Sequence, residues 1–142
     1  MAITQAMCSS FKQELLVGTH NFTNSSGNTF KLALYTSSAS LGAATTVYSS
    51  SNEASGSNYS AGGNTLTNVT PSLDSTTAIT DFDNTSWNSS TITARGGLIY
   101  NSSASNKAVA VLDFGSDKSS SNGTFSVIFP APAASTAIIR IA

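Results

Sequence analysis

Charged residues are scarce in this sequence. Asp, Glu, Lys and Arg make up 9% of its 142 residues, against about 25% in typical globular domains. The formal net charge is −1 and the cationic residues do not cluster, so the chain lacks the electrostatic footprint of a nucleic-acid-binding or membrane-surface protein. We therefore expect neither nucleic acid nor membrane as a partner. Hydrophobic residues amount to 39%, which excludes disorder maintained by charge.

Cysteine and histidine occur once each, as Cys8 and His20. One cysteine cannot form an intrachain disulfide, so a disulfide-stabilised scaffold is excluded and no oxidising compartment is needed. Transition-metal sites take several His or Cys ligands, which this chain does not have. Cys8 and His20 could act as a nucleophile and its base, but no motif surrounds Cys8, and a small buried hydrophobe is the better interpretation.

Long apolar runs are also missing. Residues 1–13 contain no basic segment followed by an apolar one, and no stretch reaches the roughly 18 consecutive apolar residues of a membrane span. We expect the protein to be made in a cytoplasm. The length suits one hydrophobic core, so the sequence predicts a single domain over residues 1–142.

Serine and threonine supply the polarity that charges do not. Together they form roughly a third of the chain, a bias that suits strand surfaces and turns and disfavours long helices. Several short strands separated by turns are typical of a sandwich or a barrel. The predicted class is therefore mainly β: a single-domain antiparallel β-sandwich or barrel with one N-terminal α-helix.

Residues 95–115 carry the clearest strand signal, two apolar runs joined by a short polar segment. This pattern predicts a hairpin in which Asn101 lies opposite Lys107 and Arg95 forms an ion pair with Asp113. Because both runs are apolar on successive residues, both faces should be covered, which places the hairpin centrally in a sheet. The same register sets Tyr100 against Ala108, Ile99 against Val109 and Leu98 against Ala110.

The N-terminal segment predicts the single helix. Apolar residues recur at four-residue steps over residues 3–17, and Gly18 is placed to end the helix. The helix should lie on the sheet, although an arm that contacts a neighbouring subunit is an alternative. The apolar members of this series are Ile3, Met7, Phe11 and Leu15.

The remaining strands differ in clarity. Residues 29–36 alternate cleanly, which predicts a strand with one buried face. Residues 37–63 are loop-rich and hold either a short strand near 45–48 or an exposed excursion with a function of its own. The C-terminal run should be tied into a sheet. Further strands are predicted at 64–70, 77–82, 124–130 and 137–141, with Pro71 between the first two.

No pattern of catalytic, cofactor-binding or metal-binding residues emerges. Asp81 to Asn84 look like the start of a calcium loop, but Ser86 and Ile92 stand where that loop needs Gly and Glu. A solvated turn is the favoured interpretation, with an irregular oxygen-ligated ion as the alternative. Asp113 has no second acid or base nearby in sequence that would make it catalytic. We therefore expect a protein without cofactor that is not an enzyme.

Aromatic residues offer one further binding hypothesis. Tyr48, Tyr59 and Trp87 lie in polar surroundings, so with Tyr35 and Tyr100 they could form a surface on which sugar rings stack. Core packing and subunit contacts are the commoner use of such residues.

The strings FKQELLVGTHNF, TFKLALYT, YSAGGNTLTNVTP, ITARGGLIYNSS and NKAVAVLDFG resemble small proteins encoded by tailed bacteriophages, especially those of marine and cyanobacterial hosts. The similarity in pattern extends from Phe11 to Ile141 and brings no catalytic residues. It implies a structural role in the virion, with capsid decoration or cement as the leading hypothesis and the major capsid protein, other virion proteins and sister copies as partners. A head-tail joint, tail or fibre component and a carbohydrate- or host-surface-binding module are the alternatives.

Overall fold

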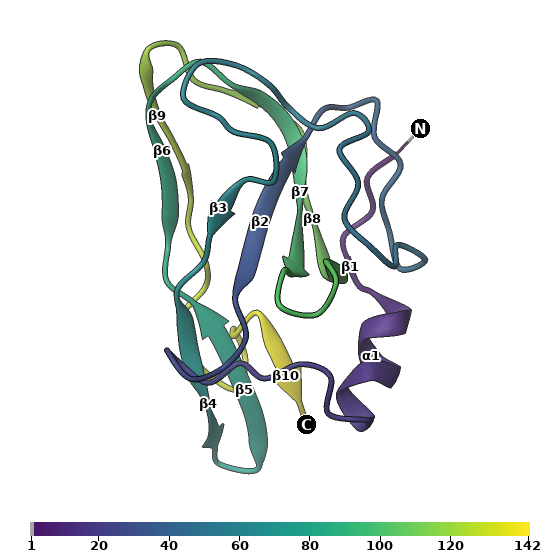
Figure 1. Ribbon diagram of the computed structural model, residues 1–142. Coiled ribbons are helices and arrows are strands. Elements are labelled where there is room, and N and C mark those ends of the chain that lie inside the picture. The colour runs from purple at the N-terminus through teal and green to yellow at the C-terminus, as the bar shows by residue number, and fades with distance from the viewer. Residues whose placement is uncertain (1) are drawn as a thin grey trace.

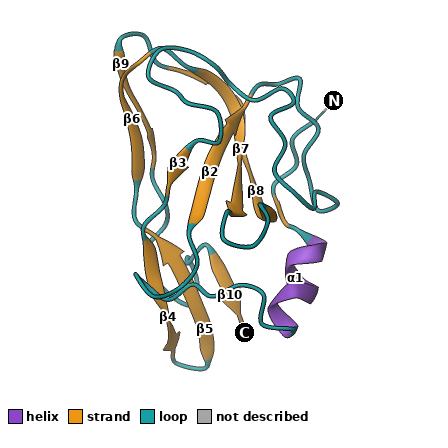
Figure 2. Cartoon of the chain, viewed as in Figure 1, coloured by secondary structure: helices purple, strands orange, loops and turns teal. Residues whose placement is uncertain are grey.

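The computed structural model describes residues 2–142. The chain is mainly β with one short helix, as its composition predicts, and the strands form three antiparallel sheets (Figures 1 and 2). The elements are β1 (Ala6–Met7), α1 (Ser9–Leu16), β2 (Phe30–Tyr35), β3 (Asn64–Thr65), β4 (Asn68–Asp74), β5 (Thr77–Phe82), β6 (Thr85–Ser90), β7 (Thr93–Asn101), β8 (Lys107–Ser119), β9 (Gly123–Val127) and β10 (Ile139–Ile141).

The largest sheet has the order β1-β8-β7-β2-β3, so the β7–β8 hairpin occupies its middle, as predicted. The two-stranded β6–β9 ribbon stands beside it, and a three-stranded sheet of order β10-β5-β4 lies at the end near the C-terminus (Figure 1). Trp87 of β6 and Phe125 of β9 belong to the same buried cluster as Leu34 of β2. The ribbon and the large sheet therefore share one core, in a sandwich-like arrangement.

The hairpin register agrees with the prediction only near the turn. Asn101 lies opposite Lys107 and Tyr100 opposite Ala108, but a shift between Ile99 and Tyr100 then sets Ile99 against Ala110. This bulge inserts one extra residue into β8. Leu98 consequently faces Val111, and not Ala110 as predicted.

The predicted ion pair between Arg95 and Asp113 is wrong. A second shift between Ala94 and Gly96 displaces this part of β8, and Arg95 Nε contacts Asp117 Oδ1 at 2.9 Å instead. Both side chains are partly exposed, so the pair contributes little to stability. The Asp113 carboxylate accepts a hydrogen bond from the Gly115 amide at 2.8 Å.

Strand β2 is buried along nearly its whole length, and not on one face as predicted. Its neighbour β7 carries the Gly96-Gly97 pair, and a Cβ on Gly97 would approach Leu32 Cδ1 to 2.9 Å. A Cβ on Gly96 would meet Ile3 Cγ2 at the same distance. The two glycines therefore let side chains from both sides close onto the centre of the sheet.

The N-terminal helix is shorter than predicted. Ile3 forms a bridge to Leu41, and β1 pairs with β8, so the helix begins only at Ser9. The apolar spacing of residues 3–7 is compatible with an edge strand as well as with a helix. Pairing with β8 gives the backbone of Ala6 and Met7 hydrogen-bond partners. The helix ends before Gly18, as predicted. Gly18, at φ +77°, donates its amide to the Leu15 carbonyl, and the Thr19 amide donates to the Glu14 carbonyl.

The excursion over residues 37–63 holds isolated bridges but no strand. Of the two alternatives for this segment, the short strand near 45–48 is therefore wrong, and one bridge between Val47 and Lys107 stands in its place. The C-terminal run is tied into a sheet as predicted, because β10 pairs with β5. Pro71 does not separate two strands. It lies inside β4, where the register shifts between Val69 and Ser72.

Substitution of Gly63 tests how closely the excursion approaches β2. Its φ is +76°, and a Cβ there would collide with the carbonyl oxygen of Leu32. Gly63→Ala should therefore lower the free energy of unfolding by roughly 3 kcal/mol or more in urea titrations. Gly115 is the matched control, because its φ is +80° but nothing lies within 4 Å of an added Cβ. Gly115→Ala should cost about 1 kcal/mol, and equal losses would contradict the close approach.

Candidate functional site

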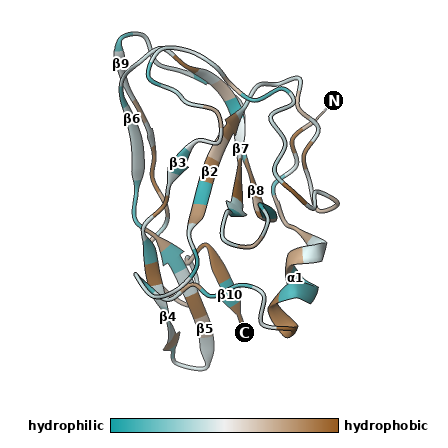
Figure 3. Ribbon diagram, viewed as in Figure 1, coloured by the Kyte–Doolittle hydropathy of each residue, from teal (hydrophilic) through white to brown (hydrophobic). Residues whose placement is uncertain are grey.

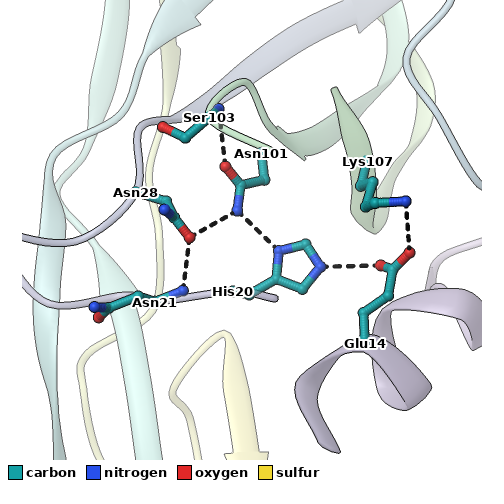
Figure 4. Close-up of polar contacts among 7 residues, drawn as sticks. All are labelled: Glu14, His20, Asn21, Asn28, Asn101, Ser103 and Lys107. Carbon is teal, nitrogen blue, oxygen red and sulfur yellow. Dashed lines mark hydrogen bonds and ion pairs between the residues drawn. The ribbon is translucent and has the colours of Figure 1, made fainter. Parts of the chain in front are cut away.

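His20 is the centre of a buried polar network between the helix and the hairpin (Figure 4). Its Nε2 lies 2.9 Å from Glu14 Oε1, and its Nδ1 lies 2.9 Å from the Asn101 side-chain nitrogen. A carboxylate only accepts hydrogen bonds, so Nε2 carries the proton and Nδ1 accepts from Asn101. Lys107 Nζ stands 3.6 Å from the other oxygen of Glu14.

Asn101 uses its whole amide in this network. Besides His20, its nitrogen donates to Asn28 Oδ1 at 3.0 Å, and its oxygen accepts from the Ser103 amide at 3.0 Å. Asn28 Oδ1 also accepts from the Asn21 amide at 2.8 Å. One fully buried side chain thus joins the hairpin turn, the segment after the helix, and the helix itself through His20.

The network does not bring a nucleophile to His20. Cys8 is fully buried, in agreement with its interpretation as a small hydrophobe, and its nearest polar contact is the Gly42 carbonyl at 4.0 Å from Sγ. Burial, with the Glu14 charge as a smaller cause, raises the pKa of the Cys8 thiol to about 11. A thiol that stays protonated at neutral pH is a poor nucleophile.

Glu53 is the centre of a second network, within the excursion. Its two carboxylate oxygens accept hydrogen bonds from the hydroxyls of Tyr48 and Tyr59, both at 2.6 Å, and from the Gly62 amide at 2.7 Å. Tyr59 in turn accepts from the Leu34 amide at 2.9 Å. Tyr100 donates to the Gly62 carbonyl at 2.7 Å. These bonds fasten the excursion to β2 and β7.

All four tyrosines of the chain belong to this region, since Tyr35 donates to the Ser49 carbonyl at 2.6 Å. Burial followed by the Glu53 charge raises the pKa of Tyr100 to about 12. Burial also raises the pKa of Tyr35, Tyr48 and Tyr59, with Glu53 adding to each shift. The sequence pointed to the tyrosines but not to Glu53, because a lone acid in a Ser-rich loop carries no spacing signal.

The predicted stacking surface is not formed by these rings. Tyr48 stacks on Tyr100 with ring centroids 4.6 Å apart, and Trp87, 4% exposed, lies between Tyr59 and Phe125. Tyr35, Tyr100 and Trp87 are buried, and one face of Tyr48 is covered by Tyr100, whereas Tyr48 and Tyr59 are partly exposed. Core packing, the commoner use, describes these aromatics.

The solvated turn expected at Asp81 to Asn84 is wrong for Asp81, which lies in strand β5, whereas Asp83 and Asn84 form the exposed connection to β6. Asp81 is buried, and its Oδ1 accepts from the Phe82 amide at 2.8 Å, while its Oδ2 has no hydrogen-bond partner among the described residues. Burial raises the pKa of this carboxyl, and the amides of Phe82 and Ile138 oppose the shift. Asn84 accepts from the Phe129 amide at 2.8 Å. Within residues 2–142, no group of three or more His, Cys, Asp or Glu side chains is placed to hold a metal ion.

The surface outside these networks includes a broad groove and an apolar end. The groove, of about 860 Å³, lies between the N-terminal residues and the excursion and is lined by small uncharged side chains together with Tyr35 and Leu41. The apolar end gathers the last turn of α1, the β4–β5 turn and the C-terminus (Figure 1). Hydrophobic colour marks the end of α1 and most of β10 there (Figure 3).

The apolar end, as used below, consists of exposed side chains around a shallow groove. Leu16 is 88% exposed, Leu73 72%, Val17 68% and Ile141 57%. A groove of about 270 Å³ at this end is lined by Ile141 and by other residues, among them Leu15, Pro71, Ala78, Thr80 and Ile139. Exposed apolar groups that cluster in this way mark contact surfaces more often than isolated ones do.

Comparisons with known proteins give no relative for this chain: no family model, no curated protein and no solved structure matches it. Among the helices of residues 2–142, none is long and apolar enough to cross a membrane.

Asn101→Ala tests the first network. The change leaves the buried His20 ring nitrogen without a partner and removes the acceptor of the Ser103 amide, so the free energy of unfolding should fall by about 3 kcal/mol in urea titrations. Asn88 is the control, because it is exposed and accepts one long bond from Thr124 at 3.3 Å. Asn88→Ala should stay within about 0.5 kcal/mol of the parent. A similar loss for both would show that the network carries little stability.

Alkaline titration tests the second network. The folded state holds the tyrosines protonated beyond their ordinary pKa of about 10, whereas the unfolded chain ionises there. Stability is therefore complete below pH about 10 and falls as the pH rises toward the folded pKa values. Tyrosinate absorbance should appear only together with loss of the far-ultraviolet circular dichroism signal. Ionisation near the ordinary pKa with the fold intact would contradict the buried arrangement.

Proposed function

We propose that this chain is a structural component of a tailed-phage virion, and specifically a capsid decoration or cement protein that stabilises the head through protein contacts. The observation that carries the proposal is the apolar end. Of the six large hydrophobic side chains that are exposed among residues 2–142, four lie there: Leu16, Val17, Leu73 and Ile141. A patch of this kind suits an apolar site on the major capsid protein.

The polar networks support a role that needs a rigid body. Hydrogen bonds among Glu14, His20 and Asn101 hold the helix against the hairpin. Hydrogen bonds to Glu53 hold the excursion in place. Contact surfaces fixed in this way lose little conformational entropy on binding. The scarcity of charge, 9% of residues, favours contacts through apolar and neutral polar groups.

The resemblance to phage proteins suggests where the protein acts. It suggests that the protein is made in the host cytoplasm and ends in the virion in many copies. A head-tail joint, tail or fibre component would use the same kind of surface and differs in symmetry and copy number. A carbohydrate- or host-surface-binding module is less well supported, because Tyr35, Tyr100 and Trp87 are buried and Tyr48 stacks on Tyr100.

The test is add-back to phage heads assembled without this protein. Leu16→Ser with Val17→Ser should weaken attachment at least about tenfold, since two exposed apolar contacts are lost and the core is untouched. Val47→Ser is the comparator, because Val47 is 48% exposed but lies in the excursion, away from the apolar end. It should attach as the parent does.

Two outcomes would contradict the proposal. Parent protein that neither binds the heads nor raises their resistance to heat or low salt would rule out the decoration role. Attachment lost with Val47→Ser and retained in the double variant would move the contact to the excursion and overturn the role given to the apolar end.

A further inference from the structure

The β6–β9 ribbon has two edges, and the protein covers only one of them. Along β6, the side-chain nitrogen of Asn64 donates to the Ser86 carbonyl at 2.9 Å, and that of Asn58 donates to the Ser89 carbonyl at 2.8 Å. Just past the strand, Thr91 forms a bridge to Ser57. Amide side chains and the excursion therefore occupy the hydrogen-bonding positions of the β6 edge.

The β9 edge has no such cover. Strand β9 pairs with β6 and with no other strand of residues 2–142. Beside it lies a groove of about 410 Å³, lined on the β9 side by Phe125, Val127 and Ile128, and on the β8 side by Phe114 and Lys118. Ile128 is 75% exposed next to this open edge. The β9 edge therefore exposes backbone groups without a strand partner next to apolar side chains.

The other open strand edges carry features that discourage pairing. Strand β4 contains Pro71 and a bulge, and Asn24 binds its Thr70 hydroxyl and Asn68 carbonyl. Strand β10 places Arg140 at its middle, and β1 and β3 have two residues each. Residues 119–129, which contain β9, include neither charge nor proline. The edge of β8 beyond its pairing with β1 carries Asp113, Asp117 and Lys118. Among the uncovered edges of strands longer than three residues, β9 is therefore the one with neither charge nor proline.

The charge pattern indicates what covers this edge. When a strand pairs with its own copy about a twofold axis, each residue meets itself or a near neighbour, so any charge would meet its like. A neutral strand escapes this repulsion, whereas β10 would oppose Arg140 to Arg140. We propose that β9 pairs antiparallel with β9 of a second copy of this chain, which joins two ribbons into one four-stranded sheet.

The joined sheet would also widen the ribbon. The inner face of the ribbon already packs on the large sheet through Trp87 and Phe125, and a second copy would add strands at its open edge. Pairing would satisfy the free backbone groups of β9 and shield Ile128 and the apolar groove beside it. This inference stands independently of the virion role, because it concerns the purified chain in solution: either can fail while the other holds.

The experiment measures molar mass by size-exclusion chromatography with light scattering over a range of concentrations. The parent should form a dimer, and Thr124→Lys with Ser126→Lys should weaken it at least about tenfold, because like charges then face each other across the axis. Both residues are exposed on β9. Ser86→Lys with Asn88→Lys is the matched control, with the same charges on exposed positions of β6, and should dimerise as the parent does.

Cysteine trapping gives a second measurement that does not depend on added charge. Thr124→Cys with Ser126→Cys should form disulfide-linked dimers under mild oxidation, whereas Ser86→Cys with Asn88→Cys should not. Cys8 is buried and should not interfere. A parent that stays monomeric at every concentration, a dimer weakened equally by the β9 and β6 lysines, or crosslinking from β6 alone would overturn the proposal.

Discussion

The buried amide of Asn101 is the contact on which the arrangement of this protein depends. It lies at the end of the central hairpin and is fully used by His20, Asn28 and Ser103. His20 extends it to Glu14 on the helix. A buried amide left unsatisfied is costly, so the hairpin turn, the segment of residues 20–28 and the helix can adopt only one mutual arrangement. The apolar end owes its shape to this constraint, because the helix ends at Leu16 and is followed directly by Val17.

Glu53 holds the excursion in place through hydrogen bonds, as Asn101 holds the helix. A segment of 27 residues without a strand, residues 37–63, would ordinarily be mobile. Hydrogen bonds from Tyr48, Tyr59 and the Gly62 amide to one carboxylate hold it against the sheet instead. Glu14, His20, Glu53 and the four tyrosines thus have structural partners. What the molecule presents outward is an apolar end, a neutral groove and one open strand edge.

Sequence patterns predicted the parts of the fold that periodicity controls. Alternation identified β2, and the paired apolar runs placed the hairpin at the centre and fixed Asn101 opposite Lys107. Bulges have no periodic signature, so the register beyond Ile99 and the partner of Arg95 were wrong. The glycine at position 115 was the hint in the sequence that β8 is irregular, and its φ is +80° in the structure. Ile3 fitted a helix equally well, and only pairing with Leu41 decides its structure. Asn101 and Glu53 gained their roles from contacts distant in sequence, which composition does not reveal.

The central claim is that the protein acts as a component of a particle, through its surfaces. The most direct test is a reconstruction of the phage virion to which the proposal assigns the protein, with the protein located in the density. The account predicts copies on the head, in the symmetry of the capsid lattice, with Leu16 and Val17 turned toward the shell. Absence from purified virions, or a position on the particle with the apolar end facing solvent, would contradict it.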